Sequence, residues 1–254
     1  MLAGFAATDI TPPVGSILNG FIARLSPSTS VDAPLHARAL WLEDGDVKCL
    51  IVGLDVLGIS TTFADRILDE LSNGLNIHQD NIVLACSHTH SGPMTARLRG
   101  IGPADEEYLS FLGKQIRKAA DAANSNKIKV SVSWSSAPID IGINRRQPVP
   151  KDGSVMLGCN PEGPCDTQVR VLHLQGNNRS IMLFHHACHP YCLGGSYTLI
   201  SPDFWGHAAA ELAHRGHEAL YLNGCGGNIA VVKAFHGPQI ARQERRRLAD
   251  AVTT

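Results

Sequence analysis

The chain has 254 residues, of which 44% are hydrophobic and 18% charged, and its formal net charge is −1. This length can bury a full hydrophobic core, and the near-neutral charge leaves no basic field to recruit nucleic acid. No stretch approaches the roughly 18 uninterrupted apolar residues of a membrane span, and the N-terminus has no signal-peptide pattern. The seven cysteines are an odd number spread along the chain, which predicts reduced thiols in a cytoplasmic protein.

The spacing of apolar residues predicts strands where they alternate or run continuously, and helices where they recur every three to four positions. In chain order, strands are expected at residues 6–10, 35–42, 48–54, 82–86, 127–135, 169–175, 181–187 and 219–222. Helices are expected at residues 61–71, 108–123 and 204–215 and from near Pro238 onward. Thr61 or Thr62 is the expected N-cap of the first helix.

Residues 144–167 are rich in Pro, Gly, Asp and Asn and are predicted to form the longest loop. Hairpin turns join some strands and helices join others, which indicates an α/β fold with a mixed β-sheet core and helices packed on it. Since no internal repeat or linker is found, we expect a single domain over residues 1–254.

A histidine pair follows the strand predicted at residues 82–86, in the sequence Ser87-His88-Thr89-His90-Ser91-Gly92-Pro93. In an extended chain residues i and i+2 point to the same side, so His88 and His90 would project together from the carboxyl end of the strand. Open α/β sheets usually bind ligands at that end, and neutral imidazole is a common metal ligand and proton carrier. The pair indicates a metal or catalytic site; the alternative is a surface pair that binds nothing.

A second histidine-rich stretch, His185-His186-Ala187-Cys188-His189-Pro190, also follows a predicted strand. Two strand ends that each deliver histidines can assemble a mononuclear metal site, for which zinc needs three or four ligands. Asp55 and Asp203 are acidic candidates to complete it, but a capping role suits Asp55 equally and Asp203 better. Cys188 and Cys192 have no second cysteine pair at ligand spacing, so no structural zinc is expected there.

A glycine-rich stretch, Asn223-Gly224-Cys225-Gly226-Gly227-Asn228, follows the last predicted strand. Such turns can offer backbone N–H groups to an oxyanion, or can simply meet a need for positive φ. Arg145 and Arg146 stand at the start of the predicted loop, where a guanidinium group can clamp an oxygen-rich substrate or form a surface salt bridge.

Segments spread over nearly the whole chain resemble, in the expected order, the neutral/alkaline non-lysosomal ceramidases and their bacterial relatives. They are residues 9–15, residues 87–93, Asn144-Arg145, His189-Pro190, Ser201-Pro202-Asp203 and residues 223–228. The resemblance implies a ceramidase-like catalytic domain and a zinc-dependent amidase whose metal polarises the scissile carbonyl. By position, the resemblance implies that His88 and His189 bind zinc. It implies that His90 contacts the substrate and that Arg145 is a substrate-side arginine.

The sequence departs from this family pattern in two ways. The family's catalytic serine lies in a Gly-Asp-Val-Ser-Pro stretch that aligns with residues 227–231, so Ala230 stands at the serine position. The family also draws a Glu and a Tyr zinc ligand from beyond this motif, whereas the chain ends at Thr254. We expect either a truncated piece or a domain without the family's C-terminal part, with further ligands from Asp55, Asp203, water or another subunit of a homo-oligomer.

Together these features predict a Zn²⁺-dependent hydrolase that uses metal-activated water to cleave an amide-like C–N bond in a small-molecule substrate. His90 would act as general acid/base or oxyanion partner, and the backbone of Gly226, Gly227 and Asn228 would help hold the oxyanion. The alternative is a degenerate family member that binds metal or ligand without turnover. A small polar amide is as compatible as ceramide, because the sequence shows no export signal or lipid-facing helix.

Overall fold

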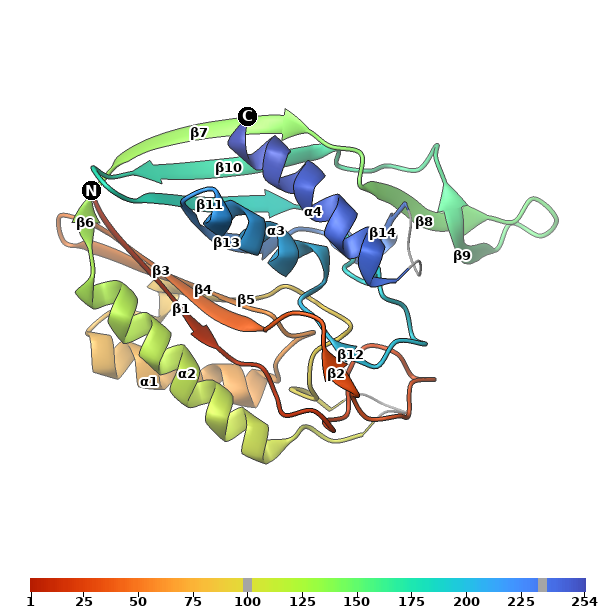
Figure 1. Ribbon diagram of the computed structural model, residues 1–254, viewed down its shortest axis with the longest axis horizontal. Helices are drawn as coiled ribbons and strands as arrows, with labels where there is room; N and C mark the ends of the chain where they lie inside the picture. The colour runs from red at the N-terminus through yellow and green to blue at the C-terminus, as the bar shows by residue number, and fades with distance from the viewer. Residues whose placement is uncertain (98–101, 233–236) are drawn as a thin grey trace.

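The computed structural model describes residues 1–97, 102–232 and 237–254. Its first large sheet consists of β1 (Leu2–Asp9), β3 (His36–Asp44), β4 (Val47–Leu54), β5 (Ile82–Cys86) and β6 (Ile128–Lys129). Its second consists of β7 (Ser131–Pro138), β10 (Gln168–Gln175), β11 (Ser180–His186) and β13 (His217–Asn223). The strand orders are β5-β4-β3-β1-β6 and β13-β11-β10-β7, and the two sheets lie one above the other (Figure 1).

Each of the two large sheets contributes apolar side chains to a core on each of its faces, because successive residues of a strand point to opposite sides. In β10, Val169 and Val171 pack into the core on the outer side of the second sheet, while Leu172 and Leu174 belong to the core between the sheets. Leu40 of β3 lies in the core between the sheets as well, and its neighbour Trp41 lies in the core on the outer side of the first sheet. Successive strand residues point to opposite faces, so this pattern builds a sandwich.

Within the described residues, four helices cover the outer faces: α1 (Thr61–Leu75), α2 (Glu106–Ser125), α3 (Asp203–His214) and α4 (Pro238–Thr253). Helices α1 and α2 pack on the first sheet, and α3 and α4 on the second. The mixed sheets and packed helices confirm the predicted α/β fold. No helix in the described residues is long and apolar enough to cross a bilayer.

Both large sheets contain one parallel strand pair joined through a helix. In the first sheet β4 and β5 are parallel and α1 connects them; in the second β11 and β13 are parallel and α3 lies between them in the chain. Parallel pairs need such crossovers, and their carboxyl ends are the common place for a binding site. His88 follows the carboxyl end of β5, and His189 follows that of β11.

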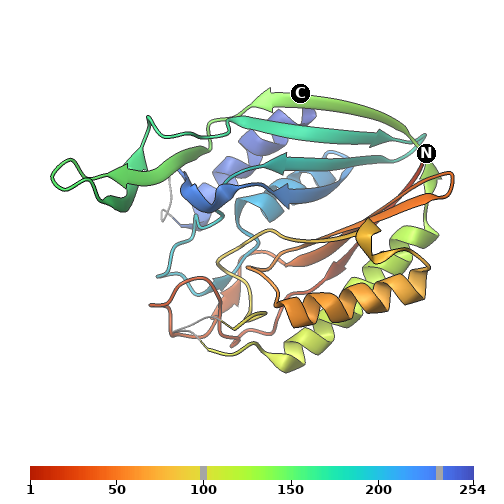
Figure 2. The same cartoon turned by 180° about the vertical axis from the view of Figure 1, so that it is seen from behind.

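Two small sheets complete the described structure. Strands β2 (Ser30–Val31) and β12 (Leu199–Ile200) form a parallel pair, and β14 (Ile229–Val231), β8 (Gly142–Pro148) and β9 (Val155–Asn160) form a three-stranded sheet. The prediction of one long loop over residues 144–167 is therefore wrong. Strands β8 and β9 form a hairpin that extends away from the sandwich, seen from both sides in Figures 1 and 2.

Two capping predictions are also wrong. The N-cap of α1 is Ser60, whose side chain accepts a hydrogen bond from the Phe63 N–H, so neither threonine has that role. Asp203 is the first residue of α3 with a left-handed φ of 57°, and Pro202 precedes it as a cap without a side-chain bond. Both caps lie one residue before the threonine or aspartate that the sequence favoured.

Candidate metal centre

His88 is held by the loop that follows β5. The chain leaves the strand at Ser87, and His88 adopts a left-handed φ of 69°, so the predicted extended conformation does not continue through the histidine pair. The His88 N–H donates to the Val56 carbonyl at 3.0 Å, and its Nδ1 lies 2.8 Å from the Leu57 carbonyl. Since a carbonyl only accepts, Nδ1 carries the proton and Nε2 keeps a free lone pair.

His189 is held by the chain around β14. Its N–H donates to the Ile229 carbonyl at 3.1 Å, and it forms a parallel bridge with Ala230. Its Nδ1 lies 3.3 Å from the Gly226 carbonyl, which assigns the Nδ1–H tautomer here too. A hydrogen bond from the second ring nitrogen to a carbonyl is the usual way in which a protein orients a metal-ligating histidine.

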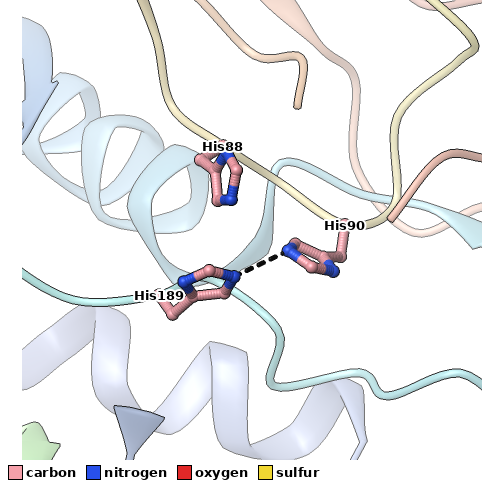
Figure 3. Close-up of side chains that lie close together, drawn as sticks. All are labelled: His88, His90 and His189. Carbon is pink, nitrogen blue, oxygen red and sulfur yellow. Dashed lines mark hydrogen bonds between the residues drawn. The ribbon is translucent and has the colours of Figure 1, made fainter. Parts of the chain in front are cut away.

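The rings of His88, His90 and His189 converge, as Figure 3 shows. Their candidate ligand nitrogens all lie within 4.8 Å of one another, the only such group among the described residues. The His90 Nε2 is 2.9 Å from the His189 Nε2, drawn as the dashed line in Figure 3. Because the His189 Nε2 has no proton, the His90 Nε2–H is the donor of this bond. The pair predicted to project together does so, and the second histidine stretch meets it.

All three imidazoles are neutral at neutral pH. Burial lowers the pKa of His90 to about 2, and the charge of Arg24 and the repulsion from His189 and His88 when these are protonated act in the same direction. Burial and the nearby Arg145 lower the pKa of His189 to about 4, and burial lowers the pKa of His88. Neutral imidazole is the form that binds metal, so the cluster is ready to coordinate without first losing protons.

A segment from Asn19 to Arg24 surrounds His90, and we call it the collar. A Cβ on Gly20 would come within 2.6 Å of the His90 ring, and the Phe21 ring lies edge-on to it at a centroid distance of 5.0 Å. The Arg24 guanidinium donates to the His90 carbonyl at 2.5 Å. The collar was not predicted, because no local pattern in the sequence shows which histidine this segment would reach.

Arg145 lies at the root of the β8–β9 hairpin and points back to the cluster. Its Nε and Nη2 donate to the Gly227 carbonyl at 3.0 and 2.6 Å, and its Cζ lies 5.5 Å from the centre of the Tyr191 ring. The buried Tyr191 was also missed by the sequence analysis; its ring contacts those of His90 and His189, with centroids 5.8 and 5.0 Å away. The adjacent His-Pro in the sequence is the signal that could have included it.

The glycine-rich turn faces the cluster with its carbonyls. Gly226 accepts from the His189 ring and Gly227 from Arg145, while the Gly226 N–H is bonded to the Gly224 carbonyl at 2.7 Å. The N–H group of Gly226 is thus already engaged, and the turn first of all fixes His189 and Arg145. Gly227 and Asn228 remain as predicted backbone donors.

The acidic candidates lie outside the cluster. Asp55 accepts from Arg38 at 2.7 Å and from the His36 N–H at 2.9 Å, so its carboxylate is neutralised within the first sheet. Asp203 is buried, and burial raises the pKa of its carboxyl group. His185 instead lines a separate cavity of about 800 Å³ with Cys225. The described residues therefore supply three histidines and no carboxylate to the centre.

The sandwich and the histidine cluster at its strand ends define an α/β protein with a candidate metal centre. Residues 1–237 match the sequence model of the neutral/alkaline non-lysosomal ceramidase family, N-terminal part. The chain belongs to this family, as the ordered motifs predicted.

Two solved structures have a similar fold. The neutral ceramidase from Pseudomonas aeruginosa is 19% identical with a TM-score of 0.83, and the match covers 99% of this chain and 44% of that one. A ceramidase complexed with C2 is 18% identical with a TM-score of 0.82, covering 99% and 43%. The chain thus spans less than half the length of these structures.

Proposed function

We propose that this protein is a zinc-dependent hydrolase that cleaves an amide-like C–N bond in a small-molecule substrate. The observation that carries the proposal is the convergence of three neutral imidazoles, two of them with Nδ1 on a backbone carbonyl and an unprotonated Nε2. Membership of the ceramidase family supports the same class of reaction.

His88 and His189 are the histidines that would hold the metal, since their tautomers leave the Nε2 lone pair toward the cluster. Zinc in such a site supplies Lewis-acid polarisation of a carbonyl and lowers the pKa of water to about 7. The donor set suits zinc, which accepts imidazole nitrogen, and two protein ligands leave room for further ligands.

His90 has a different role in this proposal. Its Nε2–H donates to His189 in the described state, and it becomes available to a substrate oxygen once the His189 lone pair is engaged elsewhere. Arg145 adds a fixed positive charge beside the histidines, which stabilises negative charge as it develops on that oxygen. Gly227 and Asn228 would supply backbone donors to the same oxygen.

Water, and not a side chain, is the proposed nucleophile. Ala230 forms the bridge with His189, so the residue at the family's serine position lies beside the candidate centre and has no hydroxyl. A general base is then needed for the water proton, and neutral His90, the third imidazole of the cluster, is the candidate to accept it and to pass it to the leaving amine nitrogen.

The collar favours an amide with an apolar part. Ile22 in the collar and Leu25, the residue that follows it, are 67% and 75% exposed. Exposed large apolar side chains beside a polar centre are typical of a site that binds an amphipathic molecule. N-acyl amides with acyl chains of graded length are therefore the substrates to test, with a small polar amide as the comparison.

Elemental analysis of the purified protein and a hydrolysis assay on this series test the proposal. We expect one zinc per chain, loss of hydrolysis on chelation, recovery on adding zinc, and no hydrolysis by His88→Ala or His189→Ala. A protein that neither contains nor binds a transition metal would overturn the proposal.

A second candidate function is metal or ligand binding without turnover, which Ala230 favours. It predicts full zinc binding with no hydrolysis of amides or esters, and it predicts that Ala230→Ser creates no activity either. Hydrolysis by the unaltered protein that depends on His90 would exclude it.

A further inference from the structure

Arg24 is a fully buried arginine bonded to three separate parts of the chain. Its side chain donates to the carbonyl of Asn19, to the carbonyl of His90 at 2.5 Å and to the carbonyl of Tyr197 at 3.3 Å. These carbonyls come from the collar, the His88–His90 loop and the segment before β12. One guanidinium group thus joins the collar to the candidate metal centre.

The position is costly for a charged group. Only 3% of Arg24 is exposed, burial lowers its pKa to about 10, and its buried Nε has no hydrogen-bond partner. No carboxylate among the described residues forms an ion pair with it. Buried cations are normally paired, so an unpaired guanidinium beside a histidine cluster indicates a task that outweighs the desolvation cost.

The contacts of His90 show what that task is. Its backbone is fixed on both sides, by Arg24 at the carbonyl and by the Pro190 carbonyl, which accepts from the His90 N–H at 3.3 Å. Its ring is confined by Gly20 and Phe21. Removing the guanidinium would release both the His90 carbonyl and the Asn19 carbonyl that anchors the collar.

We propose that Arg24 is a positioning residue for His90: by holding the His90 backbone, Arg24 keeps the His90 Nε2–H directed at the His189 Nε2. In the catalytic scheme it would set the direction in which the His90 Nε2–H donates its hydrogen bond, and that consequence rests on the proposed function. The positioning itself is a property of the metal-free protein.

Nitrogen-15 NMR of the metal-free protein, labelled in its histidines, tests the proposal. In the unaltered protein we expect an Nε2–H tautomer for His90 and a scalar coupling between the His90 and His189 Nε2 nuclei across their hydrogen bond. His90→Ala assigns the signals. Arg24→Lys keeps the charge but cannot span three carbonyls, so the coupling should be lost and the His90 ring signals should shift.

Arg179→Lys is the matched control, because Arg179 also bonds three separate segments: Asn126, Phe5 and Glu218. It should lower the Tm and leave the His90 signals unchanged. If Arg24→Lys does not fold, Arg24→Gln is measured in the same way. An intact coupling in a folded Arg24 variant would overturn the inference, whereas failure of the unaltered protein to bind zinc would overturn only the proposed function.

Discussion

The three histidines differ in which ring nitrogen faces the cluster and in whether it carries a proton. His88 and His189 place Nδ1 on carbonyls and turn an unprotonated Nε2 inward, while the His90 Nε2 carries a proton. This difference separates two proposed metal ligands from one hydrogen-bond donor, although all three nitrogens lie close together.

Single substitutions should show this division of roles. We expect His88→Ala and His189→Ala to weaken zinc binding by more than about 100-fold, which is the upper range for loss of an outer-shell partner. We expect His90→Ala to weaken it by about tenfold or less. Calorimetric titration with zinc measures these affinities, with His185→Ala as the control outside the cluster. Equal losses for all three histidines would show that His90 is a ligand.

Burial of the histidines also makes the metal-free protein sensitive to acid. His189 has a pKa of about 4 in the folded state and an ordinary value of 6.5 in the unfolded state. As the pH falls from 6.5 toward 4, the unfolded chain binds a proton that the folded chain does not, so stability decreases. Each unit of this difference is worth about 1.4 kcal/mol.

Urea unfolding of the metal-free protein at pH 7.5 and pH 5 measures the loss. His189→Gln should reduce the difference between the two pH values, and His78→Gln, on the exposed turn before β5, should leave it unchanged. A pH dependence that is the same in His189→Gln would mean that other groups cause the acid sensitivity.

At the residue scale, the sequence predicted the histidines and Arg145 but not the residues that orient them. Histidines after apolar runs are visible as a local pattern. Tyr191 and Arg24 owe their places to contacts with residues far away in the sequence; Arg24 and His90, for example, are 66 positions apart. No spacing rule carries that information.

At the scale of elements, the collar depends on a glycine whose backbone and close packing both exclude a side chain. Gly20 has a φ of 101°, and a Cβ there would lie 2.6 Å from the His90 ring. Gly15 has nearly the same φ, 102°, but nothing lies within 4 Å of its Cβ position. A side chain at either position would strain the backbone, but only a side chain at position 20 would also clash with a neighbour.

Gly20→Ala and Gly15→Ala therefore separate these two effects. We expect Gly15→Ala to destabilise the fold by about 1 kcal/mol, as positive φ costs a residue with a side chain. Gly20→Ala should cost more, since His90 must move, and should weaken zinc binding by no more than the removal of the His90 side chain does. Thermal unfolding and zinc titration of both variants measure this. Equal effects of the two variants would show that the collar does not confine His90.

The helices and most strands could be predicted because their apolar faces repeat with a fixed period. Helix α2, expected at residues 108–123, spans Glu106–Ser125, and its N-cap Asp105 accepts from the Tyr108 N–H at 2.9 Å. The β8–β9 hairpin was missed because it extends from the sandwich, so its exposure does not alternate. Val155, Met156 and Leu157 in β9 are all exposed, and such a strand has no buried face to detect.

At the scale of the whole molecule, the centre joins the two sheets. His88 follows β5 of the first sheet and His189 follows β11 of the second, and Asn223 of β13 donates to the Ser87 carbonyl at 3.1 Å between them. The sequence predicted a mixed sheet, but the division of strands between two facing sheets depends on long-range pairing. Each histidine stretch was visible from the sequence, and one site shared by the two strand ends was considered from the residues before the family resemblance named His88 and His189.

Metal binding should therefore stabilise both sheets together. A ligand that binds only the folded state adds about 2.7 kcal/mol of stability at a concentration of about 100 times its Kd. Because the proposed ligands come from different sheets, zinc should raise the Tm as one cooperative transition and slow amide hydrogen exchange in both β5 and β11.

Leu220→Ala, in the core between the sheets, should lower the Tm by removing packing while leaving the increase caused by zinc in place. His88→Ala should abolish that increase. Slower exchange in only one of the two sheets would mean that the metal is held by one side alone, and that the two strand ends do not share it.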